Sequence, residues 1–348
     1  MNRPSRRAGT VLLAIVITGC AAQPASPTSP VSAPATPVAA PTAASLPTAA
    51  PSASPVPSEL ADRLLYGRFI TDSTKAAFVA NLDGTGEHRI LDQVAGDIRS
   101  TGWTPDNHLS FVVRDAAHPD GAIWTSRTDG TGAAQYYDGR SDGCDSVFHP
   151  TWSPDASRVA LVCYRPEGSA LAVLDVATRK LHELAIYAWP SFLDNPARWS
   201  PDGTTLAYDV LHWDPTDSFV DGSRIATILA DGSAKPTYLD GFDANAARPS
   251  WAPDGRTLIY NTYDLSAVHD DVASNIYEMD ADGSKVLPFL LAAQAGAARL
   301  AQPRWDTAAS RVWVTALTGA GLRIAWIDAS TRQITILPLD GSEVEIRP

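Results

Sequence analysis

The sequence predicts an all-β fold, a six-bladed β-propeller, preceded by an N-terminal region that cannot contribute to a core. Three observations predict it. A tryptophan-containing motif recurs at nearly regular spacing, short β-rich runs with Asp-Gly turns surround each copy, and the last strand-like segment has no partner in its own unit.

The repeated motif is W-x-P-D. Full copies begin at Trp103, Trp152, Trp199 and Trp251, and Trp305-Asp306 is a degenerate fifth copy. The steps between these tryptophans are 49, 47, 52 and 54 residues. Proline presets φ for a β-turn and aspartate suits the next position, while the tryptophan offers a large apolar face for packing between sheets. Four strands in about 50 residues are typical of a propeller blade.

Each motif is followed by a run of aliphatic, aromatic and β-branched residues, which predicts a strand. These runs are His108–Val113, Arg158–Tyr164, Thr205–Val210, Thr257–Thr262 and Arg311–Ala316. A further strand then leads into an Asp-Gly turn in three units, at Ala122–Thr128, Arg224–Leu229 and Asn275–Asp280. A final strand is expected to close each unit.

The two ends of the repeat region predict one composite blade. Three strands, Leu64–Phe69, Lys75–Leu82 and Glu87–Leu91, have no tryptophan strand before them. At the other end, Glu343–Arg347 is a single strand after the last unit. We expect this segment to supply the missing innermost strand, which gives six blades and covers the exposed edges.

Two cysteines fall within the predicted propeller. Cys144 and Cys163 lie just before and just after one W-x-P-D turn, where antiparallel strands bring them near each other. Export to an oxidising compartment permits a disulfide between them. Two separate buried thiols are the alternative.

The first 58 residues predict an exported and anchored protein. Residues 1–19 combine the basic Arg3, Arg6 and Arg7 with a short apolar run, as in a signal peptide. The run ends in Ile17-Thr18-Gly19-Cys20, which resembles the bacterial lipobox, so Cys20 is the expected lipidation site. An ordinary signal peptide with a chance cysteine is the alternative, and the choice between general and twin-arginine export stays open. Residues 20–58 consist almost entirely of Ala, Pro, Ser, Thr and Val, which predicts a disordered tether to the propeller at 59–348.

The negative net charge of the chain limits the classes of partner that we expect it to bind. The formal net charge is −12, and removing the three arginines of the signal peptide takes it to −15. An acidic domain is repelled by phosphate backbones and anionic headgroups, so we expect no nucleic acid and no membrane contact other than through the lipid anchor. We expect a monomer at the extracytoplasmic face of the cell membrane.

The repeats also resemble a known family. W-S-P-D-G followed by an aliphatic strand, with the later element Ile276-Tyr277-Glu278-Met279-Asp280-Ala281-Asp282-Gly283, resembles TolB-type propeller repeats over about residues 60–348. Such blades occur in periplasmic partner-binding proteins and as accessory domains of peptidases, so the resemblance implies the fold more than the activity. A lipid-anchor signal stands here where TolB has a separate N-terminal domain.

The predicted binding surface lies on the face that carries the long connections, because recognition loops grow while scaffold turns stay short. The long connections are 137–150, 185–196, 211–222, 263–274 and 285–302. Aromatic, imidazole and carboxylate side chains in them could bind a sugar, a peptide or a cation; packing and solvation of the loops is the alternative. The candidate residues are Trp189, Phe192, His212, Trp213, Asp214, Tyr263, Asp264 and His269.

Basic residues recur one to four positions before the motif tryptophans, on the expected innermost strands. They are Arg99, Arg198, Arg248 and Arg304, and His149 occupies a similar place. They could form a basic channel mouth that attracts an anionic group, or pair with carboxylates of neighbouring blades.

Catalytic signatures are absent from the sequence. It has no G-x-S-x-G, H-E-x-x-H or P-loop motif, and no zinc-type spacing or twelve-residue calcium loop, so we expect neither catalytic residues nor a metal or other cofactor. The favoured function is a non-catalytic binding or scaffolding module for a protein, peptide or cell-envelope glycan. The alternative is a hydrolase or lyase that acts on saccharide or peptide through channel residues.

Overall fold

The computed structural model describes residues 63–71, 74–214, 216, 219–239, 245–263 and 274–347. The expected signal peptide, Cys20 and the tether lie outside the described residues, as do Asp264 and His269. Within the described residues, the structure is almost entirely β, and none of its helices is long and apolar enough to cross a membrane.

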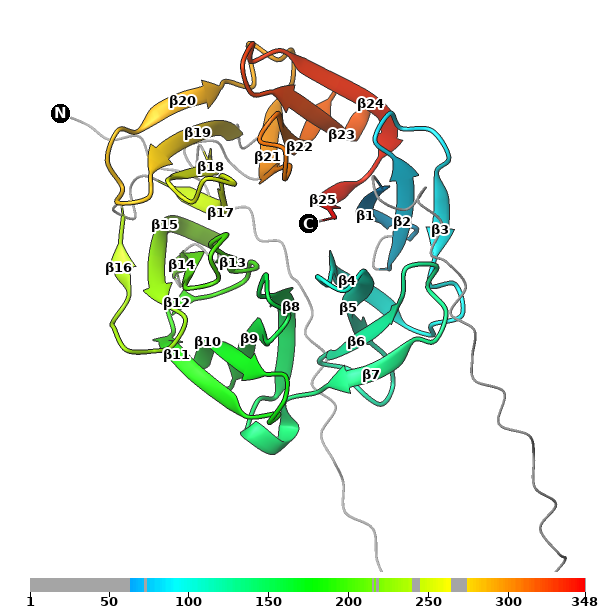
Figure 1. Ribbon diagram of the computed structural model, residues 1–348, viewed down its shortest axis with the longest axis vertical. Coiled ribbons are helices and arrows are strands. Elements are labelled where there is room, and N and C mark those ends of the chain that lie inside the picture. The colour runs from blue at the N-terminus through cyan, green and yellow to red at the C-terminus, as the bar shows by residue number, and fades with distance from the viewer. Residues whose placement is uncertain are drawn as a thin grey trace, which may run out of the picture. The chain divides into compact units, whose positions relative to one another are not determined.

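The strands form sheets arranged in a ring around a central channel, the arrangement of a β-propeller (Figure 1). The first sheet contains, from the centre outward, β25 (Ser342–Ile346), β1 (Arg63–Phe69), β2 (Lys75–Asn81) and β3 (His88–Ile90). The second contains β4 (Asp97–Trp103), β5 (His108–Arg114), β6 (Ala122–Arg127) and β7 (Ala134–Tyr137). The third contains β8 (Ser146–Trp152), β9 (Arg158–Arg165), β10 (Gly168–Asp175) and β11 (Leu181–Ala188).

The remaining strands follow the same in-to-out order. The fourth sheet has the short β12 (Ser191–Phe192) and β13 (Arg198–Trp199) beside β14 (Thr205–Asp214), then β15 (Phe219–Leu229) and β16 (Thr237–Tyr238). Next come β17 (Ala246–Trp251), β18 (Thr257–Tyr263), β19 (Ser274–Asp280) and β20 (Leu287–Leu290). The last run is β21 (Arg299–Trp305), β22 (Arg311–Thr318), β23 (Gly321–Asp328) and β24 (Ile334–Asp340).

The number of hydrogen-bonded sheets differs from the expected six. A parallel bridge between Ser274 and Arg299 joins β17–β20 to β21–β24, so hydrogen bonding groups the strands into five sheets, one of them eight-stranded. The bridge arises where β19 and the start of β21 approach each other, a pairing that the sequence repeat does not indicate.

Closure by the C-terminal strand is confirmed. β25 pairs antiparallel with β1, with Leu64 opposite Ile346 and Leu65 opposite Glu345. Val344 of β25 is buried with Tyr66 and Trp313, so the closing strand also joins a core cluster between the first and last units. The expected disulfide between Cys144 and Cys163 is present as well.

The repeat chemistry acts as predicted. Trp199 and Trp251 donate their Nε1–H groups to Thr151 O and Arg198 O of the preceding inner strand, at 2.9 and 3.0 Å, which ties neighbouring units together. In the turn, Ser153 Oγ donates to Asp155 Oδ1 at 2.6 Å and accepts the backbone N–H of Arg158 at 3.0 Å. The motif is therefore a structural element of each unit.

One predicted loop is largely wrong, and three others are shorter than expected, because strands occupy part of 137–150, 185–196 and 285–302. Most of residues 211–222 is strand, because β14 and β15 continue their hairpin from Thr205 opposite Leu229 to Asp214 opposite Phe219. A bulge at His212/Trp213 lets the pairing go on, and the aromatic and β-branched residues there suit an extended hairpin. His212, Trp213 and Asp214 thus lie on a strand.

Candidate functional site: the central channel

A cavity of about 780 Å³ occupies the central channel. Seven Lys or Arg side chains and four Asp or Glu side chains line it, although the whole chain has 27 basic and 39 acidic residues. The cavity therefore concentrates positive charge inside an acidic protein. The cations are Lys75, Arg99, Arg114, Arg198, Arg248, Arg304 and Arg347, and the anions are Asp194, Asp306, Glu343 and Glu345.

A repeated backbone bulge turns side chains toward this channel. In five inner strands, the residue three positions before the motif tryptophan, or before Ile346 in β25, is a non-glycine residue with φ between 48° and 60° at a shift of strand register. Four of these five residues line the cavity, and Gln302 does not. Bulges re-aim side chains, and because the same left-handed φ recurs in five inner strands it is a feature of the repeat. The residues are Ser100, His149, Arg248, Gln302 and Glu343.

A second set of channel residues lies one position before the tryptophan or Ile346, and all six members line the cavity. They are Gly102, Thr151, Arg198, Ser250, Arg304 and Glu345. The four arginines predicted for the channel all line the cavity, but they occupy different positions on their strands. Arg198 and Arg304 belong to the second set and Arg248 is a bulge residue. Arg99 directly precedes the bulge residue Ser100.

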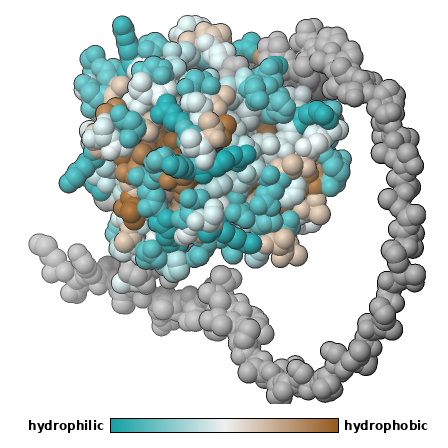
Figure 2. Space-filling view, turned by 60° about the horizontal axis from the view of Figure 1, so that its bottom comes forward, coloured by the Kyte–Doolittle hydropathy of each residue, from teal (hydrophilic) through white to brown (hydrophobic). Residues whose placement is uncertain are grey.

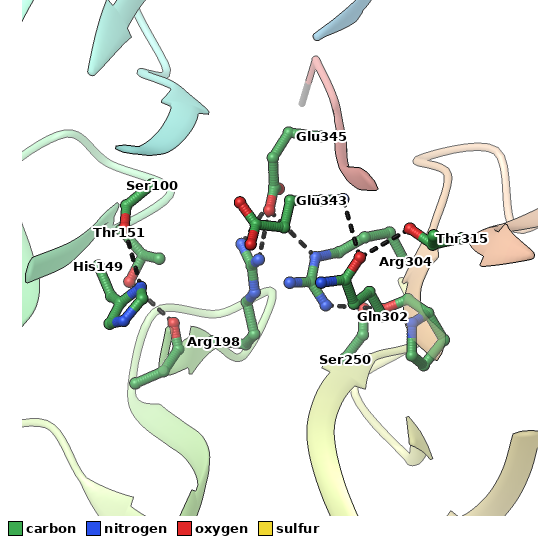
Figure 3. A network of polar contacts seen from close by, with 12 residues as sticks. Ser100, His149, Thr151, Arg198, Ser250, Gln302, Arg304, Thr315, Glu343 and Glu345 are labelled. Atoms are coloured by element: carbon green, nitrogen blue, oxygen red, sulfur yellow. Dashed lines mark hydrogen bonds and ion pairs between the residues drawn. The ribbon is translucent and has the colours of Figure 1, made fainter. Parts of the chain in front are cut away.

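Glu345 joins two of the arginines (Figure 3). It forms an ion pair with Arg198, and its Oε1 lies 3.2 Å from Arg304 Nε. Arg304 is on the neighbouring unit, whereas Arg198 is on β13 across the channel from β25 (Figure 1). Two guanidinium groups therefore crowd around one carboxylate. Burial, followed by the positive charge of Arg198, lowers the pKa of Arg304 to about 9.

Two further pairs account for other cations. Lys75 Nζ lies 2.8 Å from Glu343 Oε1, and Arg99 Nε lies 2.6 Å from Asp97 Oδ2 on its own strand. Burial alone would raise the pKa of Glu343, but Lys75 and Arg248 lower it. Pairing with a carboxylate of a neighbouring blade is thus confirmed for Arg304, whereas Arg198 pairs with the same Glu345 across the channel and Arg99 pairs within its own strand.

Arg248 differs from Arg198 and Arg304 in having no ion-pair partner among the described residues. Its Nε is buried and has no hydrogen-bond partner among those residues, as is also true of Arg198 Nε. Burial alone would lower its pKa, but Tyr263, Glu343 and Asp209 raise it, so it stays charged. Its backbone N–H donates to Asp209 Oδ1 at 3.2 Å, which fixes the bulge. Arg248 therefore lines the channel as a charged guanidinium without an ion-pair partner among the described residues.

On the opposite part of the wall, a serine, a histidine and an aspartate follow one another. Ser100 Oγ lies 3.0 Å from His149 Nδ1, and His149 Nε2 lies 3.8 Å from Asp194 Oδ1. Tyr164 Oη lies 2.9 Å from Asp194 Oδ1 and 2.7 Å from Leu193 O, so its single hydroxyl proton is shared between these two acceptors. Burial alone would raise the pKa of Asp194, but His149, Tyr164 and Arg248 lower it, so the carboxylate is ionised.

The predicted aromatic residues lie beside this wall and outside the cavity lining. Trp189 is 56% exposed and its ring centroid lies 5.0 Å from that of Phe192. Ser191 pairs with His212, and Trp213 N–H donates to Pro190 O at 2.9 Å, so Trp189, Phe192, His212 and Trp213 are brought together. The Asp214 carboxylate accepts Thr216 N–H and is used locally. Tyr263, at the end of β18, raises the pKa of Arg248.

Exposed apolar side chains are otherwise scattered. Figure 2 shows a mostly hydrophilic surface with separate hydrophobic areas. Among the described residues, no group of three or more His, Cys, Asp or Glu side chains is arranged to hold a metal ion.

Sequence reasoning missed Ser100, Asp194, Glu343 and Glu345 as channel residues. For three of them a signal was present: they lie three or one positions before a motif tryptophan or before Ile346, which replaces the tryptophan in β25. Asp194 has no such register, because it lies in the connection between β12 and β13.

No family model matches the chain. Its fold is similar to that of solved propellers. A TolB protein of Agrobacterium tumefaciens aligns with TM-score 0.59 and 16% identity over 81% of this chain and 90% of that one. TolB of Acinetobacter baumannii aligns with TM-score 0.62 and 16% identity over 84% of this chain and 68% of that one. An oligogalacturonate lyase in complex with manganese aligns with TM-score 0.52 and 16% identity over 78% and 72%. At these identities the likeness establishes the propeller fold.

Proposed function

We propose that this chain is an extracytoplasmic lipoprotein, anchored to the cell membrane through Cys20, whose propeller binds an acidic group of a protein, peptide or envelope glycan. The signal peptide would cover 1–19, the tether 20–58 and the propeller 59–348. Counted separately, β17–β20 and β21–β24 would give six blades, and the molecule would act as a monomer. The lipobox-like sequence and the uncharged tether support the anchor.

The observation that carries the binding proposal is Arg248. Its guanidinium lines the cavity and stays charged without an ion-pair partner among the described residues, so a ligand that supplies an anionic acceptor is favoured. The excess of cations in the cavity lining has the same consequence, because it lowers the energy of an added anion. A carboxylate matches the guanidinium geometry and can accept two N–H groups at once.

The surrounding surface suits a ligand larger than the acidic group. Asp194 lines the channel from the same connection that carries Trp189 and Phe192, so a chain leaving the channel on that side would meet these aromatic rings. His212, Trp213 and Tyr263 would extend this contact, together with Asp264 and His269. A propeller in a nidogen/laminin complex, similar at TM-score 0.56 and 11% identity, supports a protein partner for this fold.

The test uses isothermal titration calorimetry with short polyglutamate, oligogalacturonate, neutral maltohexaose and polylysine as probes. We expect at least one acidic probe to bind and the neutral and basic probes not to bind. Arg248→Gln should weaken that binding about tenfold or more, since a charge-assisted hydrogen bond is worth roughly 1.5–3 kcal/mol.

The matched control is Arg256→Gln, which removes an exposed arginine from a turn outside the channel and should leave the affinity unchanged. Equal affinity of the Arg248→Gln variant, or no binding of either acidic probe, would contradict the proposal. A stoichiometric divalent ion bound in the channel of the purified protein would favour a lyase, as in the manganese-bound neighbour.

A further inference from the structure

The channel wall contains an arrangement that binding alone does not require. We propose that Ser100, His149 and Asp194 form a nucleophilic relay that hydrolyses carboxylic esters bearing a negative charge. The three side chains come from β4, β8 and the β12–β13 connection, and all of them line the cavity. Figure 3 shows Ser100 and His149 facing each other at the channel wall.

The order of contacts gives each group a role. Asp194 lies on the Nε2 side of His149, at 3.8 Å, and its negative charge favours the tautomer that carries its proton on Nε2. Nδ1 is then an acceptor, and it lies 3.0 Å from Ser100 Oγ, within reach of the hydroxyl proton. Contacts of this kind are often long without substrate and shorten when it binds. The arrangement matches the roles of a serine, its base and the group that orients the base.

The backbone holds two of the groups in place. Ser100 and His149 both occupy the repeated bulge, with φ of 48° and 56°. A left-handed conformation at a residue other than glycine costs free energy, and such residues cluster where a side chain must be aimed. Asp194 is positioned by Tyr164, whose pKa is raised by burial and by Asp194, so its hydroxyl stays protonated and donates.

Comparison with another bulge pair separates this arrangement from a structural link. Between β21 and β25, Gln302 Oε1 accepts the backbone N–H of Glu343 at 2.8 Å, so that side chain satisfies a buried backbone donor. Ser100 and His149 instead contact each other through side-chain atoms only, on a half-buried cavity surface. This contact satisfies no backbone group, which leaves the Ser100 hydroxyl free to react.

The substrate class follows from the proposed function, on which this part of the inference rests. Arg248 lines the same cavity and would hold the negative charge of the substrate. The ester carbonyl would then face Ser100 within a cavity of about 780 Å³, large enough for a ligand of several rings or residues.

The reaction needs only water besides the ester. Ser100 Oγ attacks the carbonyl carbon while its proton moves to His149 Nδ1. The bond from the carbonyl carbon to the alcohol oxygen then breaks, and the alcohol leaves with that proton. Water next attacks the acyl-serine, His149 takes one of its protons, and that proton returns to Ser100 Oγ as the carboxylic acid is released and ionises.

The test is covalent labelling of the purified full chain in detergent with a fluorophosphonate probe. Ser100 Oγ would attack phosphorus, fluoride would leave, and the adduct would be located by peptide mass spectrometry. We expect a single adduct on Ser100, none in Ser100→Ala, and labelling at least 100-fold slower in His149→Gln, the range of general-base contributions. Thermal unfolding confirms that each variant is folded.

Two serines provide controls. Ser250 lines the same cavity but has no histidine partner among the described residues, so it should stay unlabelled. Ser157→Ala removes an exposed turn hydroxyl and should label at the wild-type rate. The relay is wrong if folded protein shows no adduct on Ser100, if Ser250 labels equally, or if His149→Gln labels as fast as wild type. Binding of an acidic probe that persists in any of these cases leaves the proposed function standing.

Discussion

Two parts of the channel wall are built on the same backbone and differ in chemistry. The ion-paired wall consists of Arg198, Arg304, Glu343 and Glu345, and the hydroxyl wall consists of Ser100, Thr151 and His149. Both place residues three and one positions before the end of an inner strand, and both use the left-handed bulge. The ion-paired wall connects β25 to the rest of the ring, whereas the hydroxyl wall leaves side-chain groups available for chemistry.

The difference teaches that the repeat determines where a side chain points, and that single residues then decide what it does. Ion pairs on one wall stabilise closure of the ring by a strand that is distant in sequence. The other wall lies between units that are adjacent in sequence, so it needs no such reinforcement. Changes to the ion-paired wall should therefore mainly lower stability, and changes to the hydroxyl wall should mainly lower reactivity.

The largest effect is expected from Glu345→Gln. This change leaves Arg198 and Arg304 crowded without their carboxylate, and breaking a buried ion pair typically costs about 3–5 kcal/mol. Urea denaturation should show this loss in the free energy of unfolding. Asp280→Asn, which removes the exposed partner of Lys285, should have no measurable effect. Equal effects of the two changes would mean that the ion-paired wall is not what stabilises closure.

The next effect concerns the unit behind the hydroxyl wall. Replacing Cys144 and Cys163 together by serine removes a cross-link between positions 19 residues apart, which is worth about 3 kcal/mol in a chain-entropy estimate. The same urea experiment measures the loss, with reduction of the wild type as an independent route. If Ser100 and His149 react as proposed, fluorophosphonate labelling of the folded double variant should persist. Its disappearance would show that the hydroxyl wall depends on the disulfide behind it.

A smaller effect is expected from Ser100→Ala. It removes one partly buried hydrogen bond, so the free energy of unfolding should fall by about 1 kcal/mol or less. A loss as large as that of Glu345→Gln would show that the hydroxyl wall is also structural, and the comparison between the walls would fail.

The smallest effect lies outside both walls, in the W-x-P-D turn. Hydrogen bonds from Ser153 and then Ser157 lower the pKa of Asp155 to about 2, below its ordinary value of 3.8. The folded state therefore binds this proton less readily, so its contribution to stability is present above about pH 4 and is lost as the pH falls toward 2. Asp155→Asn should flatten the pH dependence of the urea midpoint in that window, while Asp92→Asn, an exposed control, should not.

Much of the fold could be predicted from the sequence, because a short motif whose turn chemistry is local recurs in successive units. The tryptophan turns, the strand after each of them, the closing strand and the Cys144–Cys163 pairing follow from spacing and residue type. The bridge between Ser274 and Arg299 could not be predicted, since it depends on how two neighbouring units pack against each other. The extended β14–β15 hairpin was hidden by its polar residues and by a bulge.

The channel could be predicted only in part. Arginines near the tryptophans indicated it, but their partners come from elsewhere in the chain. Glu345 is recognisable only when Ile346 is placed in the position of a tryptophan, and Asp194 reaches the channel from a connection without repeat register. Which arginines form ion pairs and which one does not depends on distances of a few ångströms, which spacing along a sequence does not encode.

Pairing of β1 with β25 also has a kinetic consequence. The two strands are separated by nearly the whole propeller, so their contact carries the largest loop-closure cost in the domain and contributes to slow folding. During synthesis, every other sheet can assemble before residues 342–346 exist, yet the inner edge of the first sheet stays uncovered until they arrive. An interrupted chain that lacks this segment would expose both an unpaired strand edge and two uncompensated guanidinium groups, features by which proteases and chaperones could distinguish it from the finished protein.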